Sequence, residues 1–499
     1  MTTSTDQRET RRSARSGVIG LAGAAVSGLF GFVLAVVITR GYGPAGAGAF
    51  FAAVGLLTVA SAICTLGAET GLLWALPRRR TGPTGDAARL LPVALTPPLL
   101  LAGGTAVVGV LAAPRLAAAL FDEATAGTVR LVGLCAVGLP VLVTAGLLLA
   151  AVRGVRPIGA YVAVQFFLLP IGRPVLVGLA AAASATVLFG LVGWLVPALV
   201  AVAACAWLVV GPLGVGRGVR LRPARTDWRD FWRFALPRAG SAAIDAGSMW
   251  IGVLLAVALA GQTEAGIFGA VGRYILAGQL ALQGLRVAVA PQLSRLLGEG
   301  RPAEAAAVHR QTTTWAIVLS WPVYLLLALF APGFLAVFGP EFAAGATAMT
   351  LLAVAMLVNI AVGNVQTLLL MSGRSGLHLV AVLVNLTVTV SLSFLLAPRH
   401  GVLGVAIAWS CGIVLENLIA ATAARIVIGQ PLVDRTMLVA AAAVLAGVGL
   451  AAGTAVAVAG RGVSGLVIAV ALGAVVVMGL LALPRVRRQV WRSVRQRGG

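Results

Sequence analysis

The sequence contains few charged residues, and one basic residue type is missing altogether. Charged residues make up 10% of the 499 positions and hydrophobic residues 60%, whereas about a quarter of a soluble domain is charged. Lysine is absent, so all 37 basic residues are arginines, against 15 acidic residues. A chain with so little polar surface cannot cover itself in water. This composition excludes a soluble enzyme, a disordered chain and a disulfide-rich secreted domain, and it leaves an integral membrane protein.

Residues for catalysis and metal binding are equally scarce. The four cysteines all lie inside apolar runs and form no Cys-x-x-Cys pair, so they indicate neither a metal site nor a disulfide framework. The three histidines lie far apart in the chain. Residues 41–46 match the G-x-G-x-x-G pattern but lack the preceding strand that a dinucleotide site needs, and there is no P-loop. We therefore expect no metal, no cofactor and no enzymatic activity.

The apolar residues gather into fourteen runs, each long enough to cross a bilayer as a helix. Closed barrels are the other backbone arrangement that lipid allows, but their strands would be shorter and would alternate polar and apolar residues. The predicted fold is thus an all-α polytopic membrane protein. The runs cover residues 17–39, 46–74, 89–113, 128–151, 158–181, 186–210, 237–260, 265–293, 312–338, 343–370, 376–397, 401–422, 436–459 and 463–483.

The arginines predict the orientation of these spans. Alternate loops and both tails hold 29 of them, the opposite loops hold five, and three lie inside spans. Cytoplasmic loops of membrane proteins carry the excess of basic residues, so both termini are expected in the cytoplasm and the chain in the plasma membrane. This bias accounts for most of the net charge of +22, so nucleic acid is not an expected partner. The basic tail 484–499 either lies on anionic membrane lipid or acts as a solvated anchor.

A weak internal repeat divides the chain. Residues 43–50 (GPAGAGAF) align with 261–268 (GQTEAGIF) at an offset of 218, and a long basic stretch lies midway between them. Six spans on each side would give two lobes of equal orientation, the parallel repeat of some secondary transporters. The predicted domains are a basic tail (1–16), an N-lobe (17–210), a cytoplasmic linker (211–236), a C-lobe (237–422), two extra helices (436–483) and a basic tail (484–499).

Polar residues inside the spans are the candidate functional residues, because an ionisable group at membrane depth is costly and usually faces a cavity or a partner. Each charge is either a structural ion pair or part of a substrate or coupling site. The depth of Arg273 in its span favours a functional role for it, whereas a structural role is favoured for Arg173 and Glu416. Gln279 and Gln283 share one helix face. The candidate cavity residues are Glu69, Asp245, Arg273, Gln279, Gln283, Arg286, Asn359 and Asn385.

Several short passages resemble one family of membrane proteins. They are residues 39–44 (TRGYGP) with 48–50 (GAF), 291–294 (PQLS), 338–342 (FGPEF), and 371–374 (MSGR) followed by Asn385 and 400–406 (HGVLGVA). In their order and spacing the sequence resembles the polysaccharide-transporter, or O-antigen flippase, branch of the multidrug/oligosaccharidyl-lipid/polysaccharide (MOP) flippase superfamily. The resemblance implies two six-helix lobes around a central cavity, with alternating access.

The same resemblance implies a function. Such a protein would carry an undecaprenyl-pyrophosphate-type glycan from the inner to the outer leaflet for cell-surface polysaccharide synthesis, with Arg273 and Arg286 holding the pyrophosphate. Its expected partners are the lipid-linked glycan, membrane lipids, and a polysaccharide polymerase or glycosyltransferases.

Two alternatives remain within the superfamily: a peptidoglycan-precursor flippase and a cation-coupled multidrug antiporter. The antiporter typically has an acidic residue in its first span, and residues 17–39 have none. A membrane-embedded glycosyltransferase or polymerase would need loop carboxylates, yet the outer loops are short and hold only four acidic residues.

Overall fold

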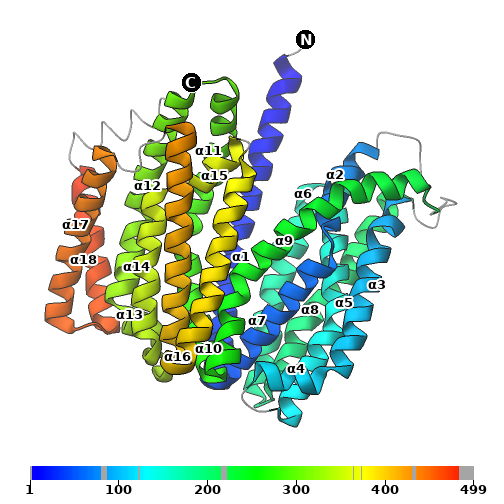
Figure 1. Ribbon diagram of the computed structural model, residues 1–499, viewed down its shortest axis with the longest axis horizontal. Coiled ribbons are helices and arrows are strands. Elements are labelled where there is room, and N and C mark those ends of the chain that lie inside the picture. Colours follow the sequence, from blue (N-terminus) through cyan, green and yellow to red (C-terminus); the bar gives the residue numbers. More distant parts are fainter. Residues whose placement is uncertain are drawn as a thin grey trace. The chain divides into compact units, whose positions relative to one another are not determined.

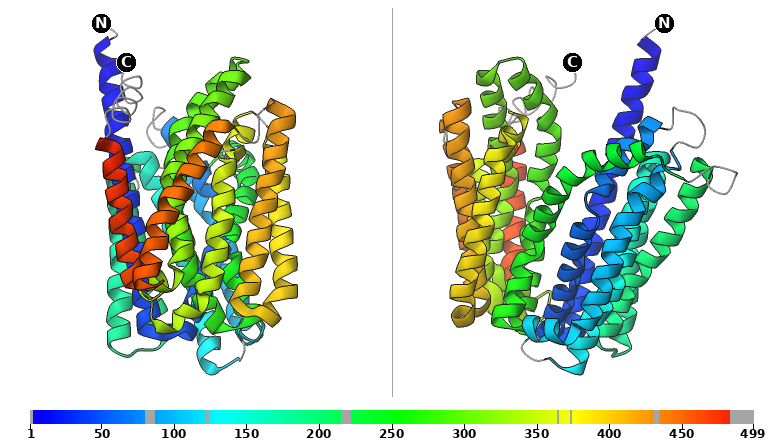
Figure 2. Two further views of the ribbon diagram at one scale, coloured as in Figure 1. Left: turned by 90° about the vertical axis from the view of Figure 1, so that its left-hand side faces the viewer. Right: turned by 45° about the vertical axis from the view of Figure 1, so that its right-hand side comes forward.

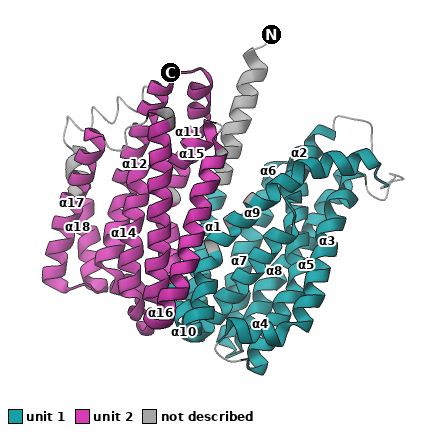
Figure 3. Ribbon diagram, in the orientation of Figure 1, with its two compact units in different colours: residues 1–269 teal, residues 270–499 magenta. Residues whose placement is uncertain are grey.

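The computed structural model describes residues 3–79, 87–121, 124–214, 222–363, 365–372, 374–429 and 434–482, and in these ranges its regular structure is entirely helical (Figure 1). The chain separates into two compact units, residues 1–269 and 270–499 (Figure 3). The all-α fold expected from the apolar runs is confirmed. The boundary between the two lobes that the sequence predicts, at the basic linker 211–236, stays a prediction.

The first unit is a bundle centred on α5, which packs against α1, α2, α3 and α8. Figure 2 shows these helices running side by side along a common direction. Buried small and branched residues such as Val143 and Ala151 allow α5 to be surrounded on several sides. The helices of this unit are α1 (Thr3–Cys64), α2 (Ala68–Arg79), α3 (Leu90–Leu111), α4 (Ala113–Leu120), α5 (Ala126–Val155), α6 (Ile158–Val162), the π-helical η1 (Ala163–Leu168), α7 (Leu169–Ala182), α8 (Val187–Leu213) and α9 (Arg225–Ala260).

Helix α10 (Gln262–Gly278) contributes to both units, and the second unit continues from it. Here α12 packs against α11, α14 and α17, and α14 also packs against α16. The remaining helices are α11 (Leu280–Gly298), α12 (Pro302–Leu329), α13 (Ala331–Leu335), the 3₁₀ helix η2 (Pro340–Gly345), α14 (Ala346–Val362), α15 (Val365–Met371), α16 (Ser375–Ile428), α17 (Arg435–Ala459) and α18 (Val463–Ala482).

Two very long helices are each two predicted spans joined at a glycine. In α1 the turn is at Gly43, with φ 66°, and Pro44 follows it. In α16 it is at Gly401, with φ 54°. Only glycine adopts such positive φ angles without a steric cost, and proline is well suited to the first turn of the helix that follows.

Because α1 and α16 each join two predicted runs, the helices that could cross a membrane are fewer than the fourteen predicted runs. In the described part of the chain, nine helices are long and apolar enough to cross a membrane, and up to eleven if each of two bent helix pairs forms one span. Two of the nine, with 43 and 51 residues, are the joined pairs in α1 and α16, and α18 is a shorter apolar helix. Large apolar side chains also face outward, including Leu111, Trp207 and Ile426, each more than three-quarters exposed. Exposed apolar surface of this extent is expected of a chain surrounded by lipid.

The repeat seen in the sequence has a counterpart in the first unit. Gly43 and Gly261, equivalent under the offset of 218, both have positive φ. A Cβ on Gly48 would overlap the carbonyl oxygen of Gln262, and one on Gly266 would overlap that of Pro44. The two contacts are reciprocal, because 44 and 48 map onto 262 and 266 under the same offset. The aligned segments therefore cross at backbone contact, which only small residues permit.

The two C-terminal helices attach to the second unit at one end. Arg461, between α17 and α18, donates hydrogen bonds to the carbonyl oxygens of Leu329 (2.7 Å) and Ala328 (3.2 Å) at the end of α12. The last carbonyls of a helix lack partners within the helix, so a guanidinium there satisfies them. Beside this contact Phe330 packs with alanines of α17 and α18.

Candidate functional site

In three predicted spans, the helix is interrupted next to a candidate site residue. Spans 46–74, 265–293 and 343–370 break between α1 and α2, between α10 and α11, and between α14 and α15. Irregular backbone at membrane depth is tolerated only where it is buried in protein or lines a cavity. When interrupted spans occupy corresponding positions in the two halves of a transporter, they point to its binding site. The first two of these spans are the second span of each predicted half.

The interruption before α2 is held in place by close packing. Leu66 has φ 50° and Gly67 has φ 73°. A left-handed backbone at a leucine costs about 1–2 kcal/mol, so the surroundings must fix it. A Cβ on Gly67 would overlap the carbonyl oxygen of Ala235 in α9. The turn therefore lies directly against α9, and glycine is required at that point.

Glu69 lies in the first turn of α2, immediately after this interruption. Its side chain is exposed, and its carboxylate oxygen Oε1 lies against α5 at Gly146, where a Cβ would overlap it. The N-terminal end of a helix carries partial positive charge, which favours a carboxylate there. The start of α2 therefore sets the position of Glu69, and Gly146 on α5 leaves room for its carboxylate.

The eighth span bends by 43° between α10 and α11. Arg273 lies on α10 before the bend, Gln279 at the bend, and Arg286 on α11 after it. Two buried tyrosines fix the rotation of α10. Tyr274 donates its hydroxyl to the carbonyl oxygen of Phe334 (2.7 Å), and Tyr324 donates to that of Ile275 (2.7 Å). Because Tyr274 is next to Arg273, this anchoring also sets the direction of the half-buried arginine.

A buried carboxylate lies at the centre of a polar cluster in the second unit. Glu416 of α16 is 6% exposed. Its two oxygens accept hydrogen bonds from the amides of Gln366 (2.5 Å) and Asn385 (2.6 Å). Thr389 donates to the amide oxygen of Asn385 (3.1 Å), which fixes the direction of that amide. The positive charge of Arg286 acts on the carboxylate from α11. Three helices therefore supply hydrogen bonds or charge to one acidic group.

A second set of polar contacts adjoins the first through the next residue of α16. Asn417 donates to the amide oxygen of Asn359 (3.0 Å), and both side chains are buried. The amide of Asn359 lies 3.9 Å from the sulfur of Met356, and that of Gln279 lies 3.7 Å from the same sulfur. These contacts connect the bend of the eighth span with α14 and α16.

The structure brings together some of the predicted site residues but not all of them. Gln279, Arg286, Asn359 and Asn385 belong to the polar cluster of the second unit, and Gln283 is exposed on α11. Arg273 lies on α10 and Glu69 lies in the first unit. The side chain of Asp245 lies outside the described residues. The functional assignment of all these residues stays a prediction.

The structural role expected for Glu416 stays a prediction, and sequence reasoning did not identify its neighbours Asn417 and Thr389. The adjacent pair Glu416-Asn417 in one apolar run, and the spacing of four between Asn385 and Thr389, were signals for them. In the first unit the guanidinium of Arg173 lies 4.1 Å from the centre of the Trp194 ring, a cation–π contact. Among the described residues, no group of three or more histidine, cysteine or acidic side chains could hold a metal ion.

No protein-family model matches the chain, and no curated protein matches it. Solved structures do match. The lipid II flippase MurJ in an inward closed conformation aligns over 92% of this chain and 99% of its own, with a TM-score of 0.72 and 10% identity. An inward-facing multidrug resistance MATE transporter of the MOP superfamily aligns over 81% and 94%, with a TM-score of 0.66 and 18% identity.

A third match is a MOP superfamily transporter from Pyrococcus furiosus, described as having a binding pocket of reverse polarity. It aligns over 84% of this chain and 95% of its own, with a TM-score of 0.53 and 16% identity. At these identities the likeness concerns the fold. The chain is similar throughout to MOP transporters and flippases, and it has the fold of a multi-pass membrane protein of that kind.

Proposed function

We propose that this protein is a flippase that moves a lipid-linked oligosaccharide of the undecaprenyl-pyrophosphate type from the inner to the outer leaflet, for cell-surface polysaccharide synthesis. The observation that carries the proposal is the bent eighth span, which has one intramembrane arginine on either side of the bend. Guanidinium groups bind phosphate oxygens in a bidentate manner, and low dielectric strengthens such contacts. In this proposal Arg273 and Arg286 hold the pyrophosphate while the prenyl chain stays in lipid.

The similarity in fold supports the same class of substrate. MurJ, a lipid II flippase, aligns with nearly the whole chain, so a fold of this kind occurs in a flippase of lipid II. A glycan on such a lipid also needs uncharged hydrogen-bonding partners, and the amides of Gln279, Gln283 and Asn385 are candidates for that role. The proposed flippase would work alongside a polysaccharide polymerase or glycosyltransferases in the plasma membrane.

The test uses purified protein in vesicles that contain a fluorescent short-chain polyprenyl-pyrophosphate oligosaccharide. We expect Arg273→Ala to lower the flipping rate at least about tenfold, because one charge-assisted hydrogen bond to phosphate contributes about 1.5–3 kcal/mol. The readout is the fraction of glycan that becomes accessible to a glycosidase outside the vesicles.

Arg173→Ala is the matched control, since it removes an intramembrane arginine that lies over Trp194 instead. Both variants are first shown to insert in the membrane and to elute as folded protein. Full activity of Arg273→Ala would remove Arg273 from the site. Wild-type protein that does not flip the glycan, but exports a lipophilic cation against an ion gradient, would favour the multidrug antiporter. Transport of the peptidoglycan precursor, but not of the oligosaccharide, would favour a peptidoglycan-precursor flippase.

A further inference from the structure

The first part of α9 has the features of a helix that lies at a membrane surface. From Arg225 to Ala239 it buries Asp227, Phe231 and Ala235, which recur every four residues along one face. Its arginines at 225, 229, 233 and 238 are exposed. The helix bends by 54° near residue 249 before its apolar end. A helix with arginines on one face and aromatic and apolar residues on the other is typical of the interface between lipid and water.

This segment is held tightly against the end of α2. Arg79 of α2 forms an ion pair with Asp227, which also accepts a hydrogen bond from the backbone N–H of Ala224 (2.8 Å). Burial by itself would raise the pKa of Asp227, but these hydrogen bonds and the charges of Arg79 and Arg89 outweigh it, so the pKa lies below its usual value. Asp227 is therefore ionised at neutral pH and compensates the charge of Arg79.

Stacked rings and guanidinium groups continue the contact between the two helices. The rings of Trp74 and Phe234 stack with their centres 4.3 Å apart. The guanidinium of Arg78 lies 4.9 Å from the centre of the Trp74 ring, and that of Arg238 lies 4.0 Å from the Phe234 ring. Arg78 also donates a hydrogen bond to the carbonyl oxygen of Trp74 (2.6 Å). Cation–π contacts and this hydrogen bond hold the Arg78 guanidinium in one place.

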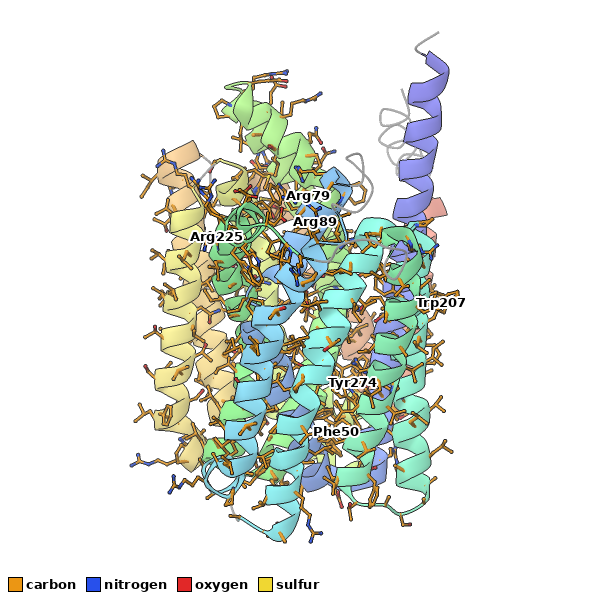
Figure 4. All side chains as sticks on the ribbon, turned by 90° about the vertical axis from the view of Figure 1, so that its right-hand side faces the viewer. Phe50, Arg79, Arg89, Trp207, Arg225 and Tyr274 are labelled. Atoms are coloured by element: carbon orange, nitrogen blue, oxygen red, sulfur yellow. The ribbon has the colours of Figure 1, made fainter. Side chains whose placement is uncertain are left out.

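A cavity of about 110 Å³ lies between these elements. It combines apolar walls with guanidinium groups and a single carboxylate, that of Asp230, which is 3.7 Å from Arg229. Figure 4 shows Arg79 and Arg89 at this end of the first unit, and two arginines and one acidic residue line the cavity. The residues that line it are Trp74, Ala75, Arg78, Arg79, Leu90, Asp230 and Phe231.

We propose that this cavity, between the end of α2, the start of α3 and the first part of α9, binds the phosphate headgroup of an anionic phospholipid of the inner leaflet. Arg78 in the lining and the exposed arginines of α9 beside the cavity favour an anionic occupant. The arginine bias of the loops predicts this end of the unit to be cytoplasmic, and the cytoplasmic leaflet carries the anionic lipids. Arg78 contacts the phosphate, the apolar walls take the first carbons of the acyl chains, and the exposed arginines of α9 lie among neighbouring headgroups.

The experiment measures lipid binding by the full-length protein in nanodiscs of phosphatidylcholine to which phosphatidylglycerol is added. We expect phosphatidylglycerol to raise the melting temperature, and Arg78→Gln to weaken its apparent affinity about tenfold, as the loss of one charge-assisted contact implies. Arg115→Gln, which removes an exposed arginine beyond α3 at the start of α4, is the matched control and should bind normally.

Equal weakening in the two variants, or no effect of phosphatidylglycerol on the wild type, would overturn the proposal. Inorganic phosphate alone producing the same shift would overturn the assignment to lipid. A short-chain polyprenyl pyrophosphate that binds where phosphatidylglycerol does not would assign the cavity to the transported lipid instead. The melting temperature of each variant in pure phosphatidylcholine separates loss of binding from loss of folding. The result does not depend on which substrate the protein moves.

Discussion

At the scale of single residues, the most informative position is Glu416. A carboxylate buried in a membrane protein is costly unless its charge and its hydrogen-bonding capacity are both satisfied. Here two amides occupy its oxygens and Arg286 supplies the opposite charge. The carboxylate of Glu416 thus has both hydrogen-bonding partners and a nearby opposite charge.

We expect Glu416→Ala to lower the free energy of unfolding by roughly 3 kcal/mol, because it removes the buried carboxylate that accepts from Gln366 and Asn385 and that faces the charge of Arg286. The double variant Glu416→Ala/Arg286→Ala should recover part of that loss, since it removes both charges. Thermal unfolding of the purified proteins in one detergent measures both effects. If the losses of the two single variants simply add in the double variant, the two side chains are not coupled.

At the scale of the elements, glycines decide where helices can approach or turn. The crossing of residues 44–48 with 262–266 brings backbone against backbone, so no side-chain rotation can relieve an added Cβ. Interruptions of the second and eighth spans likewise depend on local backbone geometry that the hydrophobic pattern does not reveal. Elements that appear continuous in hydropathy are therefore divided in the structure at the positions that carry polar residues.

We expect Gly48→Ala to destabilise the protein by about 1–3 kcal/mol, the usual cost of overpacking at a rigid contact. Gly31→Ala is the control in the same helix, because a Cβ there meets nothing within 4 Å and alanine favours the helix. Melting curves of the two variants, recorded side by side, compare them directly. A Gly48→Ala protein as stable as Gly31→Ala would mean that the crossing does not contribute to stability.

At the scale of the whole molecule, the distribution of arginines predicts the orientation of the chain in the membrane. With 29 on one side and five on the other, a cytoplasmic C-terminus is strongly favoured. We expect a fluorescent protein fused to the C-terminus to fluoresce, and alkaline phosphatase fused there to be inactive. The same phosphatase fused after residue 400, between the eleventh and twelfth spans, should be active. The reverse pattern of activities would contradict the predicted topology.

The sequence by itself determined the all-α membrane class of the protein, and it predicts the membrane spans and their orientation. These follow from summed properties, namely the apolar length of each run and the side of the membrane on which arginines lie, which hold whatever the helices pack against. The weak repeat can also be recognised from the sequence, because Gly43 and Gly261 are both needed for the same type of backbone turn.

The tertiary structure alone decided which polar residues lie together. The sequence marks Arg286 as a substrate-binding candidate and Glu416 as structural, and the fold places both near Gln366 and Asn385. Their proximity depends on how α11, α15 and α16 rotate and on where the spans break. A contact between helices far apart in the chain is set by packing, so no local pattern in the sequence records it.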